Sequence, residues 1–527
     1  MPGNAVDDTL RTLFTATSDL DTFPAAVSAH FAELYPDNEV LAQIPSLSPK
    51  NSLYSLPERS LVKFNAMVQD TSPSPEMYLA TTPDNQLGGW GIAEEHLADI
   101  DYAHLRECSL LWAVSIPGES QWSSNHGPTI SGAPTPSHPH KFPIPDVSHV
   151  GVQLKIYDTK AAENSVLDTD SPINVPTLHV LFFRQIPHTI VPRVFPSESL
   201  LPSSDGVRNE LIAWIAEEAL AEDREAAEWV LLAAIARVQS RTPPILPLSL
   251  TVSAFPSPPA EAPSSTPALC HVLSHLVPLF TTLPLSLNTL NNTSFAPESI
   301  NENLHSGRLQ LPAGSVCVVT ESGVTEGIIG EKGLTNLRTV QEMMNGQTLQ
   351  YIFPFSHFAF ETDVSFVVLT DGKKSAFFQT HANVPLRPAS PNESWKLDMY
   401  KPAEEIKLPT EETLELFRQL IGGAKTGKVS IGEAAASFIE EDFVQERKAV
   451  SSEAKKAEAA VTSDDLIHRM MVARLIALSL HEPEVSVEIW KRTKDLERKR
   501  KARVHVDASA TPTPPTPIAP STPMPST

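Results

Sequence analysis

The chain has 527 residues, of which 41% are hydrophobic, and a formal net charge of −23 from 40 basic and 63 acidic residues. A chain of this length accommodates two to four domains with hydrophobic cores, and the ordinary hydrophobic content predicts that most of it folds. Binding to the DNA phosphate backbone depends on a basic surface, so the acidic balance argues against DNA as the main partner and favours protein partners.

The first part of the chain predicts a helical segment followed by a small β domain. Apolar residues recur at helical spacing between residues 7 and 34, within a predicted N-terminal helical segment of residues 1–50. About five strands are predicted to follow, at residues 61–68, 77–80, 110–116, 152–157 and 177–183. The strand at 77–80 is expected to form a hairpin with the strand at 61–68. We predict an OB-like β domain over residues 51–192, interrupted by a Pro/Ser-rich linker at about 123–147.

Residues 206–390 predict an α/β domain. Two helices open it, and Asp223 is a candidate N-cap of the second. A further helix is expected to begin at Pro267, and another lies around residues 334–344. Buried strands alternate with these helices, at residues 248–255, 315–320, 349–353 and 365–370. This alternation is typical of a layered α/β fold.

The chain becomes helical again from Thr410, which predicts a helical lid-like region over residues 408–505. The last strong helix carries Asp464 and Asp465 in its first turn, where the helix dipole favours carboxylates. Residues 506–527 consist mainly of Ala, Thr, Pro and Ser and predict a disordered tail. The predicted fold class is therefore mixed α/β and multidomain.

The first strand of the α/β domain is followed by a loop that is unsuited to phosphate. In nucleotide-driven motors this loop is rich in glycine, because its backbone N–H groups hold the phosphates while a lysine reaches the outer ones. Here residues 256–267 contain five prolines and neither glycine nor lysine. Proline has no N–H to donate, so the loop cannot form that cradle. The sequence predicts a protein with the shape of a motor, with no cofactor and no catalytic residue.

Two other segments match parts of a nucleotide site incompletely. Thr320 and Glu321 end a buried strand where a motor has an Asp-Glu pair, and we interpret Glu321 as an ordinary strand-end carboxylate. Residues 422–428 match seven positions of a phosphate-loop pattern, but Val429 replaces the hydroxyl residue that would hold magnesium. Because a helix precedes this segment, we interpret it as a glycine helix stop followed by solvated lysines.

The sequence predicts neither a metal site nor a disulfide framework. His138 and His140 lie in the linker without a carboxylate or cysteine at ligand spacing. The three cysteines are far apart, which suits a reducing compartment. No run of about eighteen apolar residues occurs, and the first residues are acidic, so neither a membrane span nor a secretory signal is expected.

A basic run near the end of the chain has two interpretations. It is either the solvated end of an amphipathic helix or a nuclear localisation signal made of two clusters. We favour the localisation signal and therefore predict that the protein resides in the nucleus. The candidate signal residues are Lys491, Arg492, Arg498, Lys499, Arg500 and Lys501.

An ordered set of segments is similar to a known protein family. The segments are residues 60–70, 116–122, 307–312, 441–448, and 463–466 with 472–474. On these segments the chain resembles the mini-chromosome maintenance (MCM) complex-binding proteins. The resemblance implies a relative of MCM helicase subunits, with an OB-like part, a degenerate AAA+-like part and a helical lid. Asp464 and Asp465 then stand near the place where the lid of a helicase subunit has an arginine that senses the γ-phosphate, and a carboxylate there repels phosphate.

The resemblance implies a non-enzymatic protein that binds MCM helicase subunits and helps to assemble, stabilise or unload the helicase in DNA replication. Two alternatives stay open: a degenerate ATPase that retains nucleotide binding, and a single-stranded DNA binder that uses the OB-like domain. The proline loop and Thr320 argue against the first alternative. The net charge of −23 argues against the second, so direct nucleic-acid binding is not expected.

Overall fold

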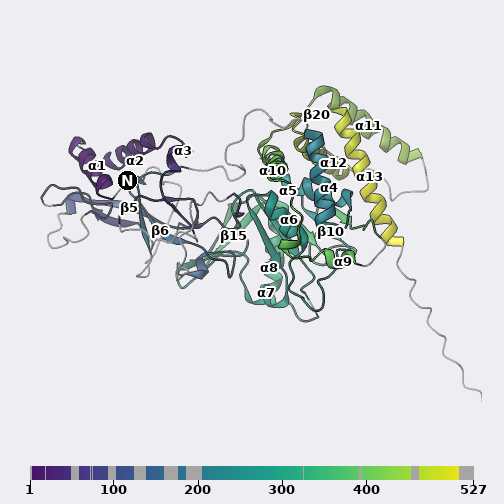
Figure 1. Cartoon of the computed structure of the whole chain (residues 1–527), viewed down its shortest axis with the longest axis horizontal. Helices are drawn as coiled ribbons and strands as arrows, with labels where there is room; N and C mark the ends of the chain where they lie inside the picture. Colours follow the sequence, from purple (N-terminus) through teal and green to yellow (C-terminus); the bar gives the residue numbers. More distant parts are fainter. Residues whose placement is uncertain are drawn as a thin grey trace, which may run out of the picture.

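The computed structural model describes residues 3–17, 19–48, 59–71, 73, 75–82, 84–92, 102–123, 138–159, 176–184, 204–324, 326–390, 394–452 and 462–509. These residues form a mixed α/β structure with several β-sheets and thirteen α-helices, which confirms the mixed α/β part of the predicted fold class. Figure 1 shows the N-terminal helices and strands at one end and the larger α/β and helical part at the other. Among the described helices, none has the length and apolar character needed to cross a bilayer.

The N-terminal helices cover one side of the first sheet. They are α1 (Gly3–Ala16), α2 (Phe23–Leu34) and the short α3 (Asn38–Leu41). Leu10, Val27 and Phe31 from α1 and α2 are buried in one cluster with Trp90 and Cys108. The helical prediction for residues 7–34 is confirmed, although a turn between α1 and α2 divides the segment into two helices.

The first sheet is built around one long strand. Its strands are β3 (Ala66–Asp70), β4 (Glu76–Leu79), β5 (Leu105–Ser115), β6 (Gly151–Ile156) and β7 (Thr177–Val180). Central β5 pairs antiparallel with β3, β4 and β6, and β6 pairs parallel with β7. The prediction of about five strands is confirmed. The predicted hairpin between the first two is wrong, because both of them pair with different stretches of the eleven-residue β5.

The second half of the linker predicted at about 123–147 is irregular chain that is anchored to the first sheet. Residues 124–137 lie outside the described residues, but residues 138–147 contain the 3-10 helix η3 (Pro139–Lys141). The side chain of Lys141 is only 1% exposed, and its Nζ lies 2.6 Å from Oδ2 of Asp70 at the end of β3. A buried ion pair therefore fixes this segment against the sheet, which the composition of the segment did not indicate.

A second, fully parallel sheet forms the centre of the molecule. Its strands are β10 (Leu250–Ser253), β11 (Phe280–Pro284), β14 (Ser315–Thr320), β17 (Val364–Leu369) and β18 (Ala382–Pro385). They lie in the order β11-β14-β17-β10-β18. All six residues of β17 are buried, as expected for a parallel strand that is covered on both faces.

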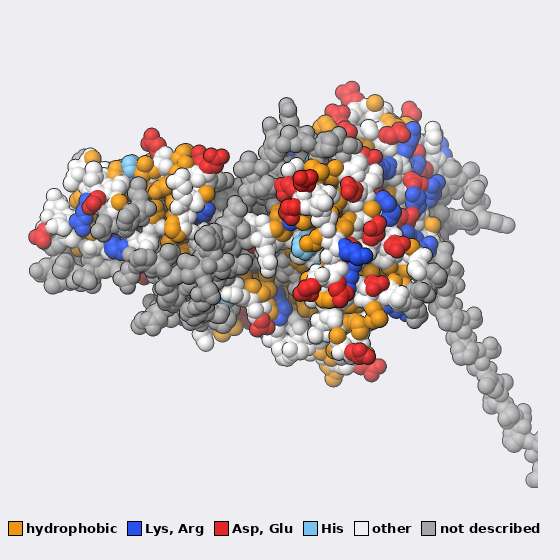
Figure 2. Space-filling model, viewed as in Figure 1, with side chains coloured by type: hydrophobic (Ala, Val, Ile, Leu, Met, Phe, Trp, Pro, Cys, Tyr) orange, Lys and Arg blue, Asp and Glu red, His pale blue; other side chains and the backbone are white. Residues whose placement is uncertain are grey.

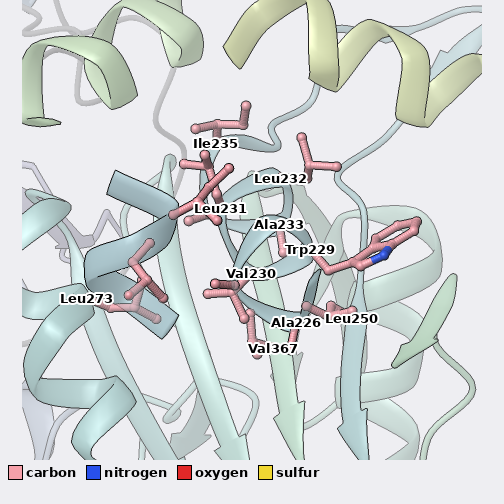
Figure 3. Packing of buried hydrophobic residues seen from close by; sticks show 14 of the residues in the cluster. Ala226, Trp229, Val230, Leu231, Leu232, Ala233, Ile235, Leu250, Leu273 and Val367 are labelled. Carbon is pink, nitrogen blue, oxygen red and sulfur yellow. The ribbon is translucent and has the colours of Figure 1, made fainter. Parts of the chain in front are cut away.

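Helices pack on this sheet through a large apolar core. The helices are α4 (Ser204–Ala219), α5 (Arg224–Ile235), α6 (Ala268–Leu276), α7 (Leu287–Asn292) and α8 (Glu331–Gly346). Figure 3 shows Trp229 and Val230 of α5 gathered with Leu250, Leu273 and Val367 in this core. Asp223 caps α5 as predicted, since its Oδ1 accepts a hydrogen bond from the backbone N–H of Ala226 at 3.1 Å.

The strand predicted at 349–353 belongs to another sheet. It is β15 (Thr348–Phe353), in a four-stranded sheet of order β13-β12-β15-β16. The other strands are β12 (Glu298–Ile300), β13 (Asn303–His305) and β16 (Ser356–Glu361). The sequence analysis placed β15 in the parallel layer and missed β11 and β18. The burial of β15 is partial, unlike that of β14 and β17, and this is the mark of a hairpin strand with one open face.

The C-terminal region is helical. It contains α10 (Glu411–Thr426), α11 (Glu433–Ser452), α12 (Ser463–Ser479) and α13 (Val487–Ser509). Thr462 and Asp465 form a reciprocal capping box that fixes the start of α12, which confirms the acidic first turn. Helix α13 continues to Ser509, so residues 506–509 of the predicted disordered tail are helical, and residues 510–527 lie outside the described residues.

The remaining elements are short. They are β1 (Ser46–Leu47), β2 (Lys63–Phe64), η2 (Tyr102–His104), β8 (Ser240–Arg241), β9 (Pro244–Ile245), α9 (Trp395–Asp398), η5 (Ala403–Glu405), β19 (Ser430–Ile431) and β20 (Glu484–Val485). Of these, the segment around α9 matters most, because it closes the carboxyl edge of the parallel sheet.

Candidate functional site at the carboxyl edge of the parallel sheet

The order of the parallel sheet locates the edge where a ligand would bind. Strand β10 is the first in the chain but lies inside the sheet, between β17 and β18. In open α/β sheets, ligands bind outside the carboxyl ends of the strands, at the point where the chain leaves in opposite directions. The loops that follow β10, β14 and β17 therefore form the candidate site.

The loop after β10 has its first backbone donors occupied. The N–H of Ala254 donates to the carbonyl of Gly372 at 2.9 Å, and the N–H of Phe255 donates to the carbonyl of Thr370 at 2.9 Å. Ala254 has a left-handed φ of 54°, which turns the chain sharply at the end of the strand. A phosphate cradle needs successive free N–H groups at this point. Here two of these N–H groups are already hydrogen-bonded to carbonyls of the loop after β17.

The proline loop is also held by Tyr400 and by the loop after β17. The hydroxyl of Tyr400 donates to the carbonyl of Pro256 at 2.7 Å, and the ring of Tyr400 meets the buried ring of Phe255 edge to face. Burial raises the pKa of Tyr400, which keeps the hydroxyl protonated as a donor. Ser257 Oγ donates to Oδ2 of Asp371 at 2.9 Å. Three segments thus meet where a nucleotide would lie.

The start of α6 is closed as well. In a phosphate-binding loop the free N–H groups at the start of the following helix point at the anion. Here the N–H of Ala268, the first residue of α6, donates to the carbonyl of Met399 at 2.7 Å. The predicted helix is confirmed, but it begins one residue later than expected, with Pro267 as the N-cap residue and Ala268 as the first helical residue.

Glu321 holds the loop after β17 in place. Its side chain is buried and accepts hydrogen bonds from Ser375 Oγ at 2.5 Å and from the N–H of Ala376 at 3.1 Å. The carboxylate is therefore engaged in structural contacts, in keeping with the interpretation of Glu321 as a strand-end residue.

The segment 422–428 differs from the prediction in two ways. Helix α10 continues through Gly422 and Gly423 to Thr426 and has Gly427 as its C-cap residue, so the predicted glycine stop lies within the segment but later than expected. A Cβ on Gly423 would lie 2.6 Å from Cε1 of His481, so this glycine allows close packing. Lys425, predicted to be solvated, is 1% exposed, and its Nζ donates to the carbonyl of Gly314 at 2.8 Å. Burial lowers the pKa of Lys425 to about 8.

The two predicted linker histidines lie in a small ring cluster. His140 is 5.6 Å from His138 and 4.4 Å from His305 between ring centroids. Burial, together with His305 and Lys141, lowers the pKa of His140 to about 4. Among the described residues no group of three or more His, Cys, Asp or Glu side chains is placed to hold a metal ion.

Segments of the resemblance meet at the junction between the first sheet and the rest of the molecule. Trp122 Nε1 donates to the carbonyl of Ser274 in α6 at 2.8 Å, and the guanidinium of Arg418 in α10 lies 4.1 Å from the centroid of the Trp122 ring. Ser120 Oγ donates to the carbonyl of Val277 at 2.6 Å. The segment 116–122 therefore fastens the N-terminal sheet to two helices of the α/β and helical part.

A second contact joins the same two parts. Gln310 Nε2 donates to the carbonyl of Gln69 at 2.8 Å and to the hydroxyl of Tyr351 at 2.9 Å. Asp70, next to Gln69, forms the buried pair with Lys141. Segments 60–70 and 307–312 both belong to the resemblance, and Gln69 and Gln310 bring them into contact. This contact could not be predicted from local sequence patterns, because the two residues are 241 positions apart.

The C-terminal segments of the resemblance form an ion-pair network. Lys494 Nζ lies 2.7 Å from Asp442 Oδ1 and 2.7 Å from Glu446 Oε1, and Arg469 pairs with the same Glu446 at 2.6 Å. These contacts hold α11 and α12 to α13. The acidic residues of segment 441–448 are thus partners of α13, which no local pattern in the sequence indicated.

The candidate localisation residues lie on α13 and are all ion-paired. Lys491 pairs with Glu488, Arg492 with Asp205, Arg498 and Lys499 with Asp495, Arg500 with Glu497, and Lys501 with Asp465. Figure 2 shows basic and acidic side chains interspersed along the side of the molecule that carries α13. The two interpretations of the run are not exclusive, and its role as a localisation signal stays a prediction.

The chain matches one protein family over most of its length. A model of the family described as Mini-chromosome maintenance replisome factor matches residues 31–148 and 145–504. Three similar relatives are each named Mini-chromosome maintenance complex-binding protein. They come from Salmo salar (28% identical over 342 residues), Homo sapiens (27% over 358) and Arabidopsis thaliana (25% over 335).

These alignments cover 62%, 65% and 62% of this chain and 51%, 53% and 52% of the respective relatives. The chain thus spans about half the length of the curated relatives it matches. The family match itself extends across both the N-terminal sheet and the α/β and helical part. On this basis, the chain belongs to the family described as Mini-chromosome maintenance replisome factor.

Proposed function

We propose that this protein binds the MCM helicase complex and does not act as an enzyme. The observation that carries the proposal is the family match over most of the chain, together with relatives that are named MCM complex-binding proteins. The partner in this proposal is one or more MCM helicase subunits. The role is to assemble, stabilise or unload the helicase during DNA replication.

The closed carboxyl edge supports a role without nucleotide chemistry. In the loop after β10, the N–H groups of Ala254 and Phe255 donate to carbonyl groups of the loop after β17. The first N–H group of α6 donates to the carbonyl of Met399. Binding ATP there would require breaking these hydrogen bonds and moving Tyr400 from the proline loop. A surface that binds another protein needs none of this rearrangement.

We also propose a domain division that follows from similarity to helicase subunits. Residues 51–192 would form an OB-like β domain, residues 206–390 a degenerate AAA+-like domain and residues 408–505 a helical lid. The parallel sheet with its first strand in the interior is consistent with the second assignment, and the contacts of α10 and α12 with α4 and α5 are consistent with the third. The junction contacts of Trp122 and Gln310 would let these domains present one continuous surface to a partner.

Nuclear residence is part of the proposal, because the MCM complex acts on chromosomal DNA in replication. The basic residues of α13 are the candidate signal, from Lys491 and Arg492 to the cluster 498–501. A fluorescent fusion of the full chain is expected to accumulate in the nucleus. Exclusion of that fusion from the nucleus would contradict this part of the proposal.

The direct test is capture of MCM subunits by the full chain. The tagged chain is immobilised and exposed to nuclear extract, and MCM subunits are quantified by mass spectrometry against a tag-only control. We expect enrichment of MCM subunits by at least about tenfold, and purified subunits should then bind the chain without other proteins. An eluate in which no MCM subunit exceeds the control would count against the proposal.

A further inference from the structure

Strand β16 presents an open edge. It ends the order β13-β12-β15-β16, so among the described strands it pairs only with β15. In this antiparallel pair the register sets Phe353 opposite Ser356 and runs without a shift to Thr348 opposite Glu361. Every residue from His357 to Glu361 is exposed. An edge of this kind is a template for another strand.

The register also tells which backbone groups point outward. The N–H of Thr362 donates to the carbonyl of Gln347, so this opposed pair is hydrogen-bonded. Opposed pairs in an antiparallel ladder alternate between bonded and non-bonded. The pairs formed by Phe358 and Phe360 are therefore bonded to β15, and the N–H and C=O groups of His357, Ala359 and Glu361 point away from it.

Edge strands usually carry features that prevent further pairing. Lysine, proline, a bulge or an inward charge serves this purpose in natural sheets. Residues 356–361 contain neither lysine nor proline, and the β15–β16 register contains no bulge. Phe358 and Phe360 are 53% and 48% exposed on one face of the strand. The edge lacks protection and carries apolar side chains, as is typical of an interaction surface.

The sequence of β16 is complementary to itself about Ala359. If a second copy pairs antiparallel with Ala359 opposite Ala359, then His357 faces Glu361 of the other copy, and Phe358 faces Phe360. Each of these pairs occurs twice by symmetry, and the outward backbone groups of residues 357, 359 and 361 all fall in hydrogen-bonded positions. An imidazole N–H can donate to a carboxylate, and facing aromatic residues are favourable cross-strand pairs.

We propose that the chain forms a symmetric dimer through β16, which joins two four-stranded sheets into one continuous sheet. Two-fold symmetry with a self-complementary patch is the commonest way for identical chains to associate. Glu361 is already paired with Arg241 of its own chain at 3.0 Å, but its side chain is 73% exposed and open to a second partner. The dimer is independent of MCM binding.

The interface is small, so association is expected to depend on concentration. A pair of short edge strands buries less than a standard stable interface. Light scattering should give twice the monomer mass of 57.4 kDa at about 100 μM and the monomer mass on dilution to about 1 μM. A chain that remains monomeric at about 100 μM contradicts the proposal. The β16 edge would then be available to pair with a strand of another protein.

Substitutions at His357 test the register, because this side chain is exposed and can change without disturbing the core. H357E places a carboxylate opposite Glu361 twice, and we expect association to weaken about tenfold. H357K places a cation there and should preserve or strengthen the dimer. Equal behaviour of H357E and H357K would contradict the proposed pairing.

Hydrogen–deuterium exchange tests the edge directly and guards against misfolded variants. In the wild-type chain, raising the concentration should slow exchange of the amides of His357, Ala359 and Glu361. The amides of Phe358 and Phe360, already bonded to β15, should change little. F355S, at the fully exposed hairpin tip outside the paired segment, is the matched control and should leave association unchanged. Protection elsewhere with unchanged residues 357–361 would place the dimer interface on another surface.

Discussion

Asp70→Ala is expected to lower the free energy of unfolding by about 3–5 kcal/mol. Lys141 Nζ lies 2.6 Å from Oδ2 of Asp70, and the two side chains are 1% and 2% exposed. Burial lowers the pKa of Lys141 while Asp70 acts to raise it. Without the carboxylate, the buried ammonium would lose its anionic partner and keep the ring of Trp112, at 5.1 Å, and nearby histidines such as His140 as neighbours. Urea denaturation followed by tryptophan fluorescence measures the loss.

The matched control removes both charges. The double variant Asp70→Leu with Lys141→Met leaves no uncompensated charge, so it should recover most of the stability that Asp70→Ala loses. If Asp70→Ala and the wild-type chain unfold at the same urea concentration, the pair does not stabilise the junction as described. Capture of MCM subunits by the destabilised variant would further show whether the fixed junction matters for binding.

Asp223→Ala is expected to cost a similar amount, about 3–5 kcal/mol, because it removes acceptors from three groups at once. Its Oδ1 caps α5 through the N–H of Ala226, and its Oδ2 accepts from the N–H of Arg387 at 2.8 Å. The guanidinium of Arg503 on α13 donates to both carboxylate oxygens, at 2.5 and 2.9 Å. Asp223 is 4% exposed, so water cannot replace these bonds. Urea denaturation again gives the change in unfolding free energy.

Asp223→Asn separates the cap from the charge. Asparagine is as good an N-cap as aspartate, so the start of α5 should survive. Arg503 would lose the charge of Asp223 and keep its ion pair with Glu225 at 2.6 Å. We expect a loss between those of wild type and Asp223→Ala, with faster amide exchange near Arg503. If Asp223→Asn were as damaging as Asp223→Ala, the contribution of the cap would be negligible.

Local patterns were sufficient where the determinant of structure is local. The strand at 315–320 was predicted to the residue, since a continuous apolar run between turns is typical of a buried strand. The N-cap role of Asp223 follows from its position before an amphipathic helix. Its partner Arg503 lies 280 residues away and could not be read from the sequence. The same limit applies to Lys141 and Asp70, whose segment reads as a linker by composition.

Errors arose where one pattern has two structural uses. A pair of glycines can stop a helix or let another chain approach, and the contact of Gly423 with His481 decides for packing. Two short strands in sequence can form a hairpin or share a longer neighbour, and β5 was long enough to pair with both. The apolar segment 349–353 indicated a strand but not its sheet, because the pairing of β15 depends on β16 and β12.

The lack of a phosphate-binding loop could be predicted from the sequence, but the residues that close the site in its place could not. Five prolines after β10 exclude a phosphate cradle from the sequence alone. The groups that fill the edge, Tyr400 and the carbonyl of Met399, come from a segment more than 130 residues later. Their placement depends on the position of α9 against the sheet, which no periodicity specifies.

Calorimetric titration of Mg-ATP into the full chain tests the central claim most directly. The account predicts no binding heat up to about millimolar nucleotide, because the N–H groups of Ala254, Phe255 and Ala268 are already engaged. Saturable binding with a micromolar dissociation constant would contradict it, and would mean that the carboxyl edge still opens to a nucleotide.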